Sequence, residues 1–404
     1  MREKYMTEEV VSEVKYEENK LLEFHRMNSK ISSYRVYRDG IVGIYRHVGE
    51  ISDEEGFLRA EKNLERERSY PFSPESGKRK RDMTRRELTD KELLDTAKEC
   101  MQYLCEKYPC FIFSAGFTQR RRVDTWWNEN DTDFENRDSA VNVNVEFKHV
   151  DSKDITDGDF GFGLRDFDKE VFFKMADDYL ENYEKEAEFP EELIIDMQYY
   201  GLLDMFYGCL HGERLALGTS LFSGKEGEKL FSEDFNLLHD VSDEECWFHR
   251  FWDGDGCVQE GDKRVFIDKG VLISGYSDKR IAKKYSIPHT GNAHPYYSDV
   301  PEPGGLNLRI ARSKKTVKEL LGGRYCVIPM SFNGGGFVEN GDYVRPVQCA
   351  LLSDGEKILG KLPPFTMVSS LYDMFGKDFI GVGADNPIFH DKQILFKAKK
   401  REIL

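Results

Sequence analysis

The chain has 404 residues, 39% of them hydrophobic and 13% aromatic, which is enough for two or three domains with substantial cores. Its formal charge of −16 argues against general nucleic-acid binding, which relies on clustered Lys and Arg. Neither a run of about 18 apolar residues nor an apolar signal-peptide core occurs, so we expect a cytoplasmic protein. The eight scattered cysteines are expected to be free thiols.

The first 85 residues are predicted to form an α+β unit that ends in a basic linker. Asp39-Gly40 lies between two β-rich runs, which is a hairpin signal. Ser52 and Glu55 have the spacing of a capping box and predict a helix immediately afterwards. The basic run at 78–86 follows Pro, Ser and Gly, so we interpret it as a solvated linker, with a nucleic-acid-binding arm as the alternative.

A middle α+β unit is predicted over residues 86–188. Thr89 and Glu92 form a second capping-box pair before a helix with one apolar stripe. The run AVNVNVEFKH at 140–149 alternates apolar and polar residues, which is typical of a half-buried strand. Apolar residues at helical spacing predict another helix within 168–184.

Residues 189–404 are predicted to form a β-rich domain, which makes the whole chain α+β. The Asn340-Gly341 pair is a second hairpin signal, and a capping box at Thr316 and Glu319 predicts one helix that stops at Gly322. The apolar stretch 199–208 is predicted to be a buried helix that leads into a polar loop.

Histidine and cysteine are few enough to be searched for metal ligands. One cluster combines a Cys and a His three residues apart with a His upstream and a Cys downstream: Cys246, His249, His239 and Cys257. Structural zinc usually needs two close ligand pairs, and this cluster has one, so packing and surface roles are the alternative to a metal. No dinucleotide, P-loop or nucleophile-elbow motif occurs. We predict no metal and no cofactor.

The order of several sequence blocks nevertheless resembles a known family. In the second half these are GTSLFSGKEGEKLF, FWDGDGCVQEGDKRVFIDKG, HTGNA, ELLGGRYCVI, NGGGFVENGDYVRPV and MFGKDFIG, and near the start YRVYRDGIVGIYRH. Their order is similar to that of the TldD/PmbA family, whereas residues 68–165 match it only loosely. The resemblance implies the family's β-rich C-terminal domain at 189–404.

Members of this family, long called modulators of DNA gyrase, include zinc peptidases built as TldD–TldE pairs. In the active subunit a helix carries His-Glu-x-x-x-His, and a cysteine near the C-terminus completes the zinc site, with the glutamate as general base. When the block TSLFSGKEGEK is aligned with the family, the two histidine positions fall on Leu203 and Gly208. The glutamate position falls on Asp204, and the cysteine position falls close to Phe375. The resemblance therefore points to the TldE/PmbA branch, which lacks the zinc motif.

Three hypotheses for function follow from this resemblance. The first is a non-catalytic subunit, in a homodimer or with a zinc-bearing TldD-like partner, that supports proteolysis of extended or unfolded peptides. Its peptide-contacting candidates are His211, His289, Thr290 and Asn292. The second is an active peptidase with an altered site around Asp204, Cys209 and His211. The third is a stand-alone peptide-binding regulatory module. We expect no membrane contact and no direct contact with nucleic acid.

Overall fold

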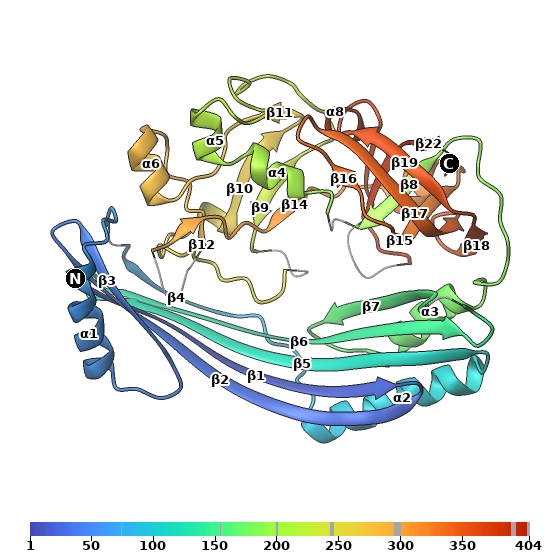
Figure 1. The fold of residues 1–404 in the computed structure, drawn as a ribbon, viewed down its shortest axis with the longest axis horizontal. Coiled ribbons are helices and arrows are strands. Elements are labelled where there is room, and N and C mark those ends of the chain that lie inside the picture. The colour runs from blue at the N-terminus through green and yellow to red at the C-terminus, as the bar shows by residue number, and fades with distance from the viewer. Residues whose placement is uncertain are drawn as a thin grey trace.

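The structure is a computed structural model that describes residues 1–73, 75–153, 155–198, 201–242, 246–294, 300–388 and 393–401. The N-terminal half is one long, curved sheet, antiparallel except for β4, with helices against it (Figure 1). Its strands are β1 (Arg2–Glu17), β2 (Lys20–Arg38), β3 (Ile41–Val48), β4 (Gly77–Asp82), β5 (Phe111–Asn128), β6 (Thr132–His149) and β7 (Gly158–Leu164). Its α-helices are α1 (Asp53–Lys62), α2 (Asp90–Lys107) and α3 (Lys169–Leu180).

The C-terminal half, which begins at β8, contains a large mixed sheet and smaller ones. The large sheet consists of β8 (Ile194–Gln198), β15 (Cys326–Phe332), β16 (Gly336–Phe337), β17 (Asp342–Ser353), β18 (Ile358–Leu362), β19 (Phe365–Ser370), β20 (Phe379–Val382), β21 (Gln393–Lys397) and β22 (Lys399–Arg401). A second sheet contains β9 (Leu237–Asp240), β10 (Lys263–Asp268), β11 (Val271–Leu272) and β14 (Leu308–Ile310), and β12 (Ala293–His294) pairs with β13 (Glu302–Pro303). The short helices are α4 (Asp204–Cys209), α5 (Gly212–Ala216), α6 (Lys279–Tyr285), α7 (Val317–Leu321) and α8 (Leu371–Met374).

The α+β fold class predicted from the sequence is confirmed, and the local signals explain much of it. The Thr89 hydroxyl accepts the Glu92 N–H while the Glu92 carboxylate accepts the Thr89 N–H, which starts α2. The hairpin of β2 and β3 turns at Asp39 and Gly40, both with positive φ. The same capping box starts α7, which ends at Gly322 in the left-handed conformation. Local hydrogen bonding thus positions these elements before long-range packing acts.

The basic run predicted as a linker is instead β4, which pairs in parallel with the first residues of β6. Its cations are held by acidic groups and backbone carbonyls. Arg79 donates to both carboxylate oxygens of Asp262 at 2.7 and 2.6 Å, and Arg81 donates to the carbonyls of Val241 and His249. These contacts join the N-terminal sheet to the C-terminal half. The strand forms because these long-range partners neutralise charges that look solvated in the sequence alone.

The strands of residues 1–85 and 86–188 belong to one sheet, since β1 pairs with β5 over its whole length. The apolar face of β6 packs against α2 and α3, while Asn142, Asn144 and Glu146 point to the opposite face. That opposite face looks toward the C-terminal half (Figure 1). Among the described helices, none combines the length and the hydropathy that a bilayer-spanning helix requires.

Candidate functional site

The position where the resemblance places the zinc site is filled by aromatic side chains. Leu203 is 5% exposed and Phe375 is fully buried, and both belong to the core of the C-terminal half. The Phe375 ring lies 5.1 Å from that of Phe206 and 4.9 Å from that of Phe235. We call the group of Phe206, Phe222, Phe231, Phe235 and Phe375 the aromatic cluster. It offers no lone pair with which to hold a metal.

The helix predicted over 199–208 is shorter than expected. Residues 199 and 200 lie outside the described residues, and α4 begins only at Asp204. Gly201 has a φ of +77°, which a helix cannot continue through, so the chain turns between β8 and α4. Gly208, the second histidine position, is inside this six-residue helix.

The three residues of the predicted altered peptidase site lie on the same short segment but do not form a catalytic unit. Asp204 is exposed at the first turn of α4, whereas Cys209 is buried and its pKa is raised by burial to about 11. Burial also lowers the pKa of His211, whose ring packs edge-on against Tyr276 at 5.3 Å. Within the described part of the chain, no hydrogen bond joins these three side chains. A thiol kept protonated and without a base is a poor nucleophile.

Packing and hydrogen bonding explain part of the predicted cluster of His239, Cys246 and His249. The backbone N–H of Asn307 donates to His239 Nδ1 at 2.9 Å, and its side-chain amide donates to Cys246 Sγ at 2.7 Å. Burial lowers the pKa of His239 to about 4 and that of His249 to about 3, so both imidazoles are neutral near pH 7. Cys257, the fourth member, lies in a different group.

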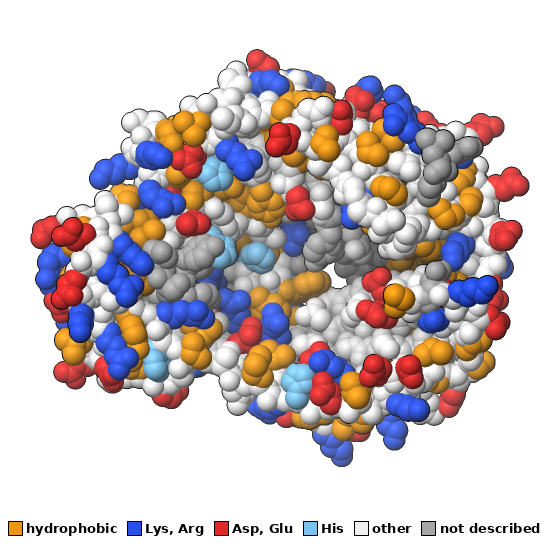
Figure 2. Space-filling model, in the orientation of Figure 1, with side chains coloured by type: hydrophobic (Ala, Val, Ile, Leu, Met, Phe, Trp, Pro, Cys, Tyr) orange, Lys and Arg blue, Asp and Glu red, His pale blue; other side chains and the backbone are white. Residues whose placement is uncertain are grey.

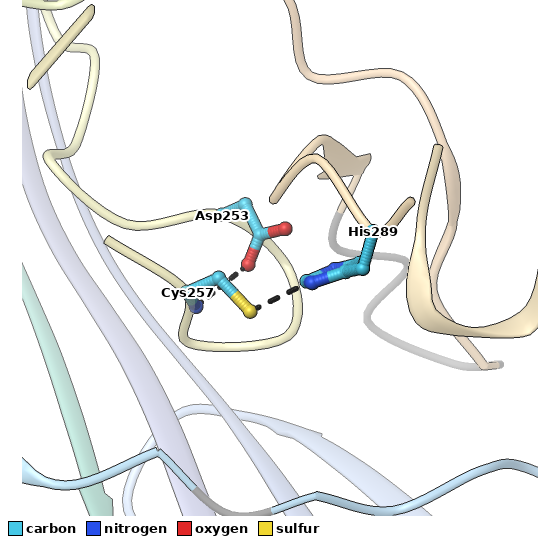
Figure 3. Close-up of side chains that lie close together, drawn as sticks. All are labelled: Asp253, Cys257 and His289. Carbon is cyan, nitrogen blue, oxygen red and sulfur yellow. Dashed lines mark hydrogen bonds between the residues drawn. The ribbon is translucent and has the colours of Figure 1, made fainter. Parts of the chain in front are cut away.

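Cys257 meets His289 where two loops of the C-terminal half converge (Figure 3). Cys257 Sγ is 3.8 Å from His289 Nε2, and ligand atoms of Asp253, Cys257 and His289 all lie within 4.8 Å of one another. We call these three residues the loop cluster. Burial raises the pKa of Asp253 to about 7, raises the pKa of the Cys257 thiol far above its ordinary value, and lowers the pKa of His289.

Thr290 and Asn292 flank the loop cluster and were predicted to contact peptide together with His289. Thr290 is buried, and its hydroxyl both accepts the N–H of Ser277 and donates to the Ser277 carbonyl. Asn292 is 1% exposed, and neither polar atom of its side chain has a hydrogen-bond partner among the described residues. Thr290 therefore holds the loop, while Asn292 retains unused donor and acceptor capacity.

A cavity of about 410 Å³ separates the two halves (Figure 2). On one side it is lined by Asn142 and Asn144 of β6 and by residues 159–163 of β7. On the other side it is lined by Asp196 of β8, residues 328–330 of β15 and Arg345 of β17. None of the predicted peptide-contacting residues is among its lining residues.

Sequence reasoning did not identify this cavity, although two signals for it are present. The sequence placed Asn142 and Asn144 on the polar face of a strand, but it did not indicate what that face contacts. Asp196 interrupts an otherwise apolar strand, and its burial raises its pKa to about 8. A charged residue inside an apolar run commonly indicates a polar site.

Comparison with known proteins agrees with the fold and with the sequence blocks. Residues 192–394 match the family described as PmbA/TldA metallopeptidase C-terminal domain. The chain is 23% identical over 300 residues to an uncharacterised protein of Methanocaldococcus jannaschii, covering 70% of this chain and 68% of that one. It is 25% identical over 171 residues to a metalloprotease TldD homolog of Buchnera aphidicola, covering 42% of this chain and 35% of that one.

Two solved structures share the fold over almost the whole chain. TldE from Thermococcus kodakarensis has a TM-score of 0.79 at 17% identity, covering 99% of this chain and 96% of that one. A Thermotoga maritima protein named as a modulator of a DNA gyrase has a TM-score of 0.80 at 17% identity, covering 99% of this chain and 95% of that one. With the family match extending over half of its residues, this chain belongs to the TldD/PmbA family.

Proposed function

We propose that this chain is a non-catalytic, TldE/PmbA-like subunit that assists a zinc-bearing TldD-like partner in the proteolysis of extended or unfolded peptides. The observation that carries the proposal is the aromatic cluster: Phe375 and Leu203 are core residues at positions where catalytic relatives are expected to hold zinc. A zinc peptidase needs imidazole, thiolate or carboxylate ligands and an open coordination position there. The predicted cytoplasmic location and the dimeric assembly are parts of the same proposal.

The cavity between the halves supports a role in holding peptide. Among the described strands, β7 pairs only with β6, which places it at an edge of the N-terminal sheet. Gly161 and Gly163 on this strand pack tightly against β6, because an added Cβ would lie 2.5 Å from the Val143 carbonyl oxygen and 2.2 Å from Asn142 Oδ1. An extended peptide can bind such an edge by strand addition, independently of its sequence. This suits a substrate class of unfolded chains.

Reconstitution with a partner tests the subunit role. The purified chain is mixed with a TldD-like protein from the same cell that carries His-Glu-x-x-x-His, and digestion of an unfolded protein is followed. We expect a stable complex, chelator-sensitive cleavage by the complex, and no cleavage by this chain alone. Zinc-dependent cleavage by this chain alone, or the absence of a complex with any such protein, would overturn the proposal.

Two matched substitutions on one strand face test the role of the cavity. Asn144→Trp places a large side chain in the cavity, whereas Glu146→Trp places the same side chain two residues along β6, outside it. Both original residues are exposed, so neither change disturbs the core. We expect Asn144→Trp to lower peptide binding and partner-dependent cleavage by about tenfold, or ~1.4 kcal/mol. Equal effects of the two variants would argue against a peptide route through the cavity.

A further inference from the structure

The loop cluster combines three ligand types that transition metals bind: a thiol, an imidazole and a carboxylate. Cys257 comes from the loop before β10, with Asp253 four residues upstream, while His289 comes from the loop after α6 (Figure 3). The loop cluster is a different group of residues from Leu203, Gly208 and Phe375, which offer no such ligands. The inference that follows does not rest on the proposed subunit role.

The distances within the cluster suit a tetrahedral zinc ion. With Zn–S near 2.3 Å and Zn–N near 2.0 Å, tetrahedral geometry separates sulfur and nitrogen by about 3.6 Å. Cys257 Sγ and His289 Nε2 are 3.8 Å apart. Glu75, from the segment before β4, brings a fourth ligand atom, since its Oε1 accepts from Cys257 Sγ at 3.1 Å. Glu75 is adjacent to the group through Cys257, whereas the ligand atoms of Asp253, Cys257 and His289 all lie within 4.8 Å of one another.

The two loops are held together by hydrogen bonds that do not involve a metal. Asp253 Oδ1 accepts the N–H groups of Asp255 and Cys257, and Oδ2 accepts that of Ala293. Gln259 donates to the carbonyls of Thr290 and Gly291. Gly291, with a φ of +64°, lies so close that an added Cβ would be 3.3 Å from Cys257 Cβ. The ligands are thus positioned in advance, which lowers the entropic cost of binding.

The charge around the cluster favours a cation. Carboxylates at Glu3, Asp255 and Asp278 lie in the same buried neighbourhood as the cluster and Glu75, and the cations that face this neighbourhood are Arg35, Lys279, Arg280 and Arg264. Arg35 is already engaged by Glu3 and the Gly254 carbonyl, and Lys279 by Glu75 and the Ser73 carbonyl. Acidic groups therefore exceed basic ones, and a divalent ion would offset the difference. His289 is exposed, which leaves a path for the ion to enter.

We propose that Cys257, His289, Asp253 and Glu75 bind a zinc-class divalent cation that fastens the segment before β4 to the loops of the C-terminal half. On binding, the Cys257 thiol gives its proton to solvent and the thiolate takes the metal, with no change in oxidation state. With Glu75 turned toward the ion as the fourth protein ligand, no coordination position stays open, so the role is structural. The ion would stabilise the contact between Glu75 and the two loops of the C-terminal half.

Cobalt and zinc binding to the full chain test this assignment. After chelator treatment and dialysis, Co²⁺ is titrated while the thiolate-to-cobalt charge-transfer absorption is recorded, and Zn²⁺ stoichiometry is measured by equilibrium dialysis. We expect one ion per chain and a Kd at least about 100-fold weaker in Cys257→Ser and His289→Gln, since even outer-shell changes cost 10–100-fold. A smaller loss is expected in Glu75→Gln, because a neutral amide oxygen can still act as a ligand.

The controls separate this site from the predicted altered peptidase site. Cys209→Ser/His211→Gln and His294→Gln are expected to leave the cobalt spectrum and the zinc Kd unchanged. If the Cys257 variant does not fold, X-ray absorption of the zinc-loaded wild-type chain replaces it, and a sulfur scatterer at about 2.3 Å is expected. Absence of binding, zinc with only nitrogen and oxygen neighbours, or a binding loss in the Cys209/His211 variant would each overturn the proposal.

Discussion

The aromatic cluster and the loop cluster occupy the same half of the molecule and differ in what surrounds their central residues. The Phe375 ring is enclosed by other aromatic rings, with centroid distances of 4.9 to 6.5 Å. Cys257 is surrounded by an imidazole and by carboxylates instead. A metal needs lone pairs and negative charge, whereas a core needs close-packed apolar volume. The position where the resemblance places the zinc site therefore meets the requirement for a packed core and does not meet the requirement for a metal.

The largest predicted effect tests whether the aromatic cluster is a core element. Phe375→Ala removes a fully buried ring and leaves a cavity, so we expect the free energy of unfolding to fall by about 3–5 kcal/mol. Phe24→Ala, the same change at a ring that is 41% exposed on β2, should stay within about 0.5 kcal/mol. Urea unfolding measures both. Similar small losses in both variants would mean that the ring at 375 is not packed as the structure has it.

A second prediction concerns His239, a histidine outside the loop cluster that burial keeps neutral. His239 accepts the Asn307 N–H, and its folded pKa of about 4 lies below its ordinary 6.5. The unfolded chain therefore binds the proton more tightly. The contribution of His239 is complete above about pH 6.5 and declines as the pH falls toward 4, by about 3 kcal/mol in total.

The His239→Gln variant measures that contribution directly. Glutamine can still accept the Asn307 N–H but does not titrate, so the fall in unfolding free energy between pH 7 and 4 should be shallower than in the wild type. His25→Gln makes the same substitution at an exposed histidine and serves as the control for replacing a histidine by glutamine. A His239→Gln slope equal to that of the wild type would contradict a neutral, buried imidazole.

The contrast between the two clusters also explains which features the sequence predicted. Capping boxes at Thr89 and Thr316 and the alternation around Val143 depend on residues a few positions apart, so they were found. Cys257 and His289 are separated by the strands β10 and β11 and the helix α6, and only tertiary folding brings them together. The pairing of β4 with β6 is similarly long-range. Spacing rules detect ligands that lie on one helix or strand. They miss a site whose ligands come from two separate loops.

A third prediction separates support of the loop cluster from ligation within it. The buried Tyr70 hydroxyl donates to Asp255 Oδ1 at 2.6 Å, beside the cluster but not as a ligand. Tyr70→Phe leaves that carboxylate short of a donor and should lower the unfolding free energy by about 2 kcal/mol. Zinc Kd should remain within about twofold, in contrast to Cys257→Ser. Tyr325→Phe, at an exposed tyrosine, is the control for stability. A large change in zinc affinity in Tyr70→Phe would mean that Asp255 is itself part of the site.

The smallest predicted effect concerns Asp204, the residue at the glutamate position of catalytic relatives. It is exposed at the start of a six-residue helix, where a carboxylate contributes a few tenths of a kcal/mol through the helix dipole. Asp204→Asn should therefore change stability by less than about 0.5 kcal/mol and the rate of partner-dependent digestion by less than about twofold. Asp204→Glu, which restores the longer side chain, should be equally silent. If Asp204→Asn instead abolished cleavage while folding stayed intact, the carboxylate would be acting as a base. The aromatic cluster would then border an active site, and the contrast between the two clusters would no longer distinguish structure from catalysis.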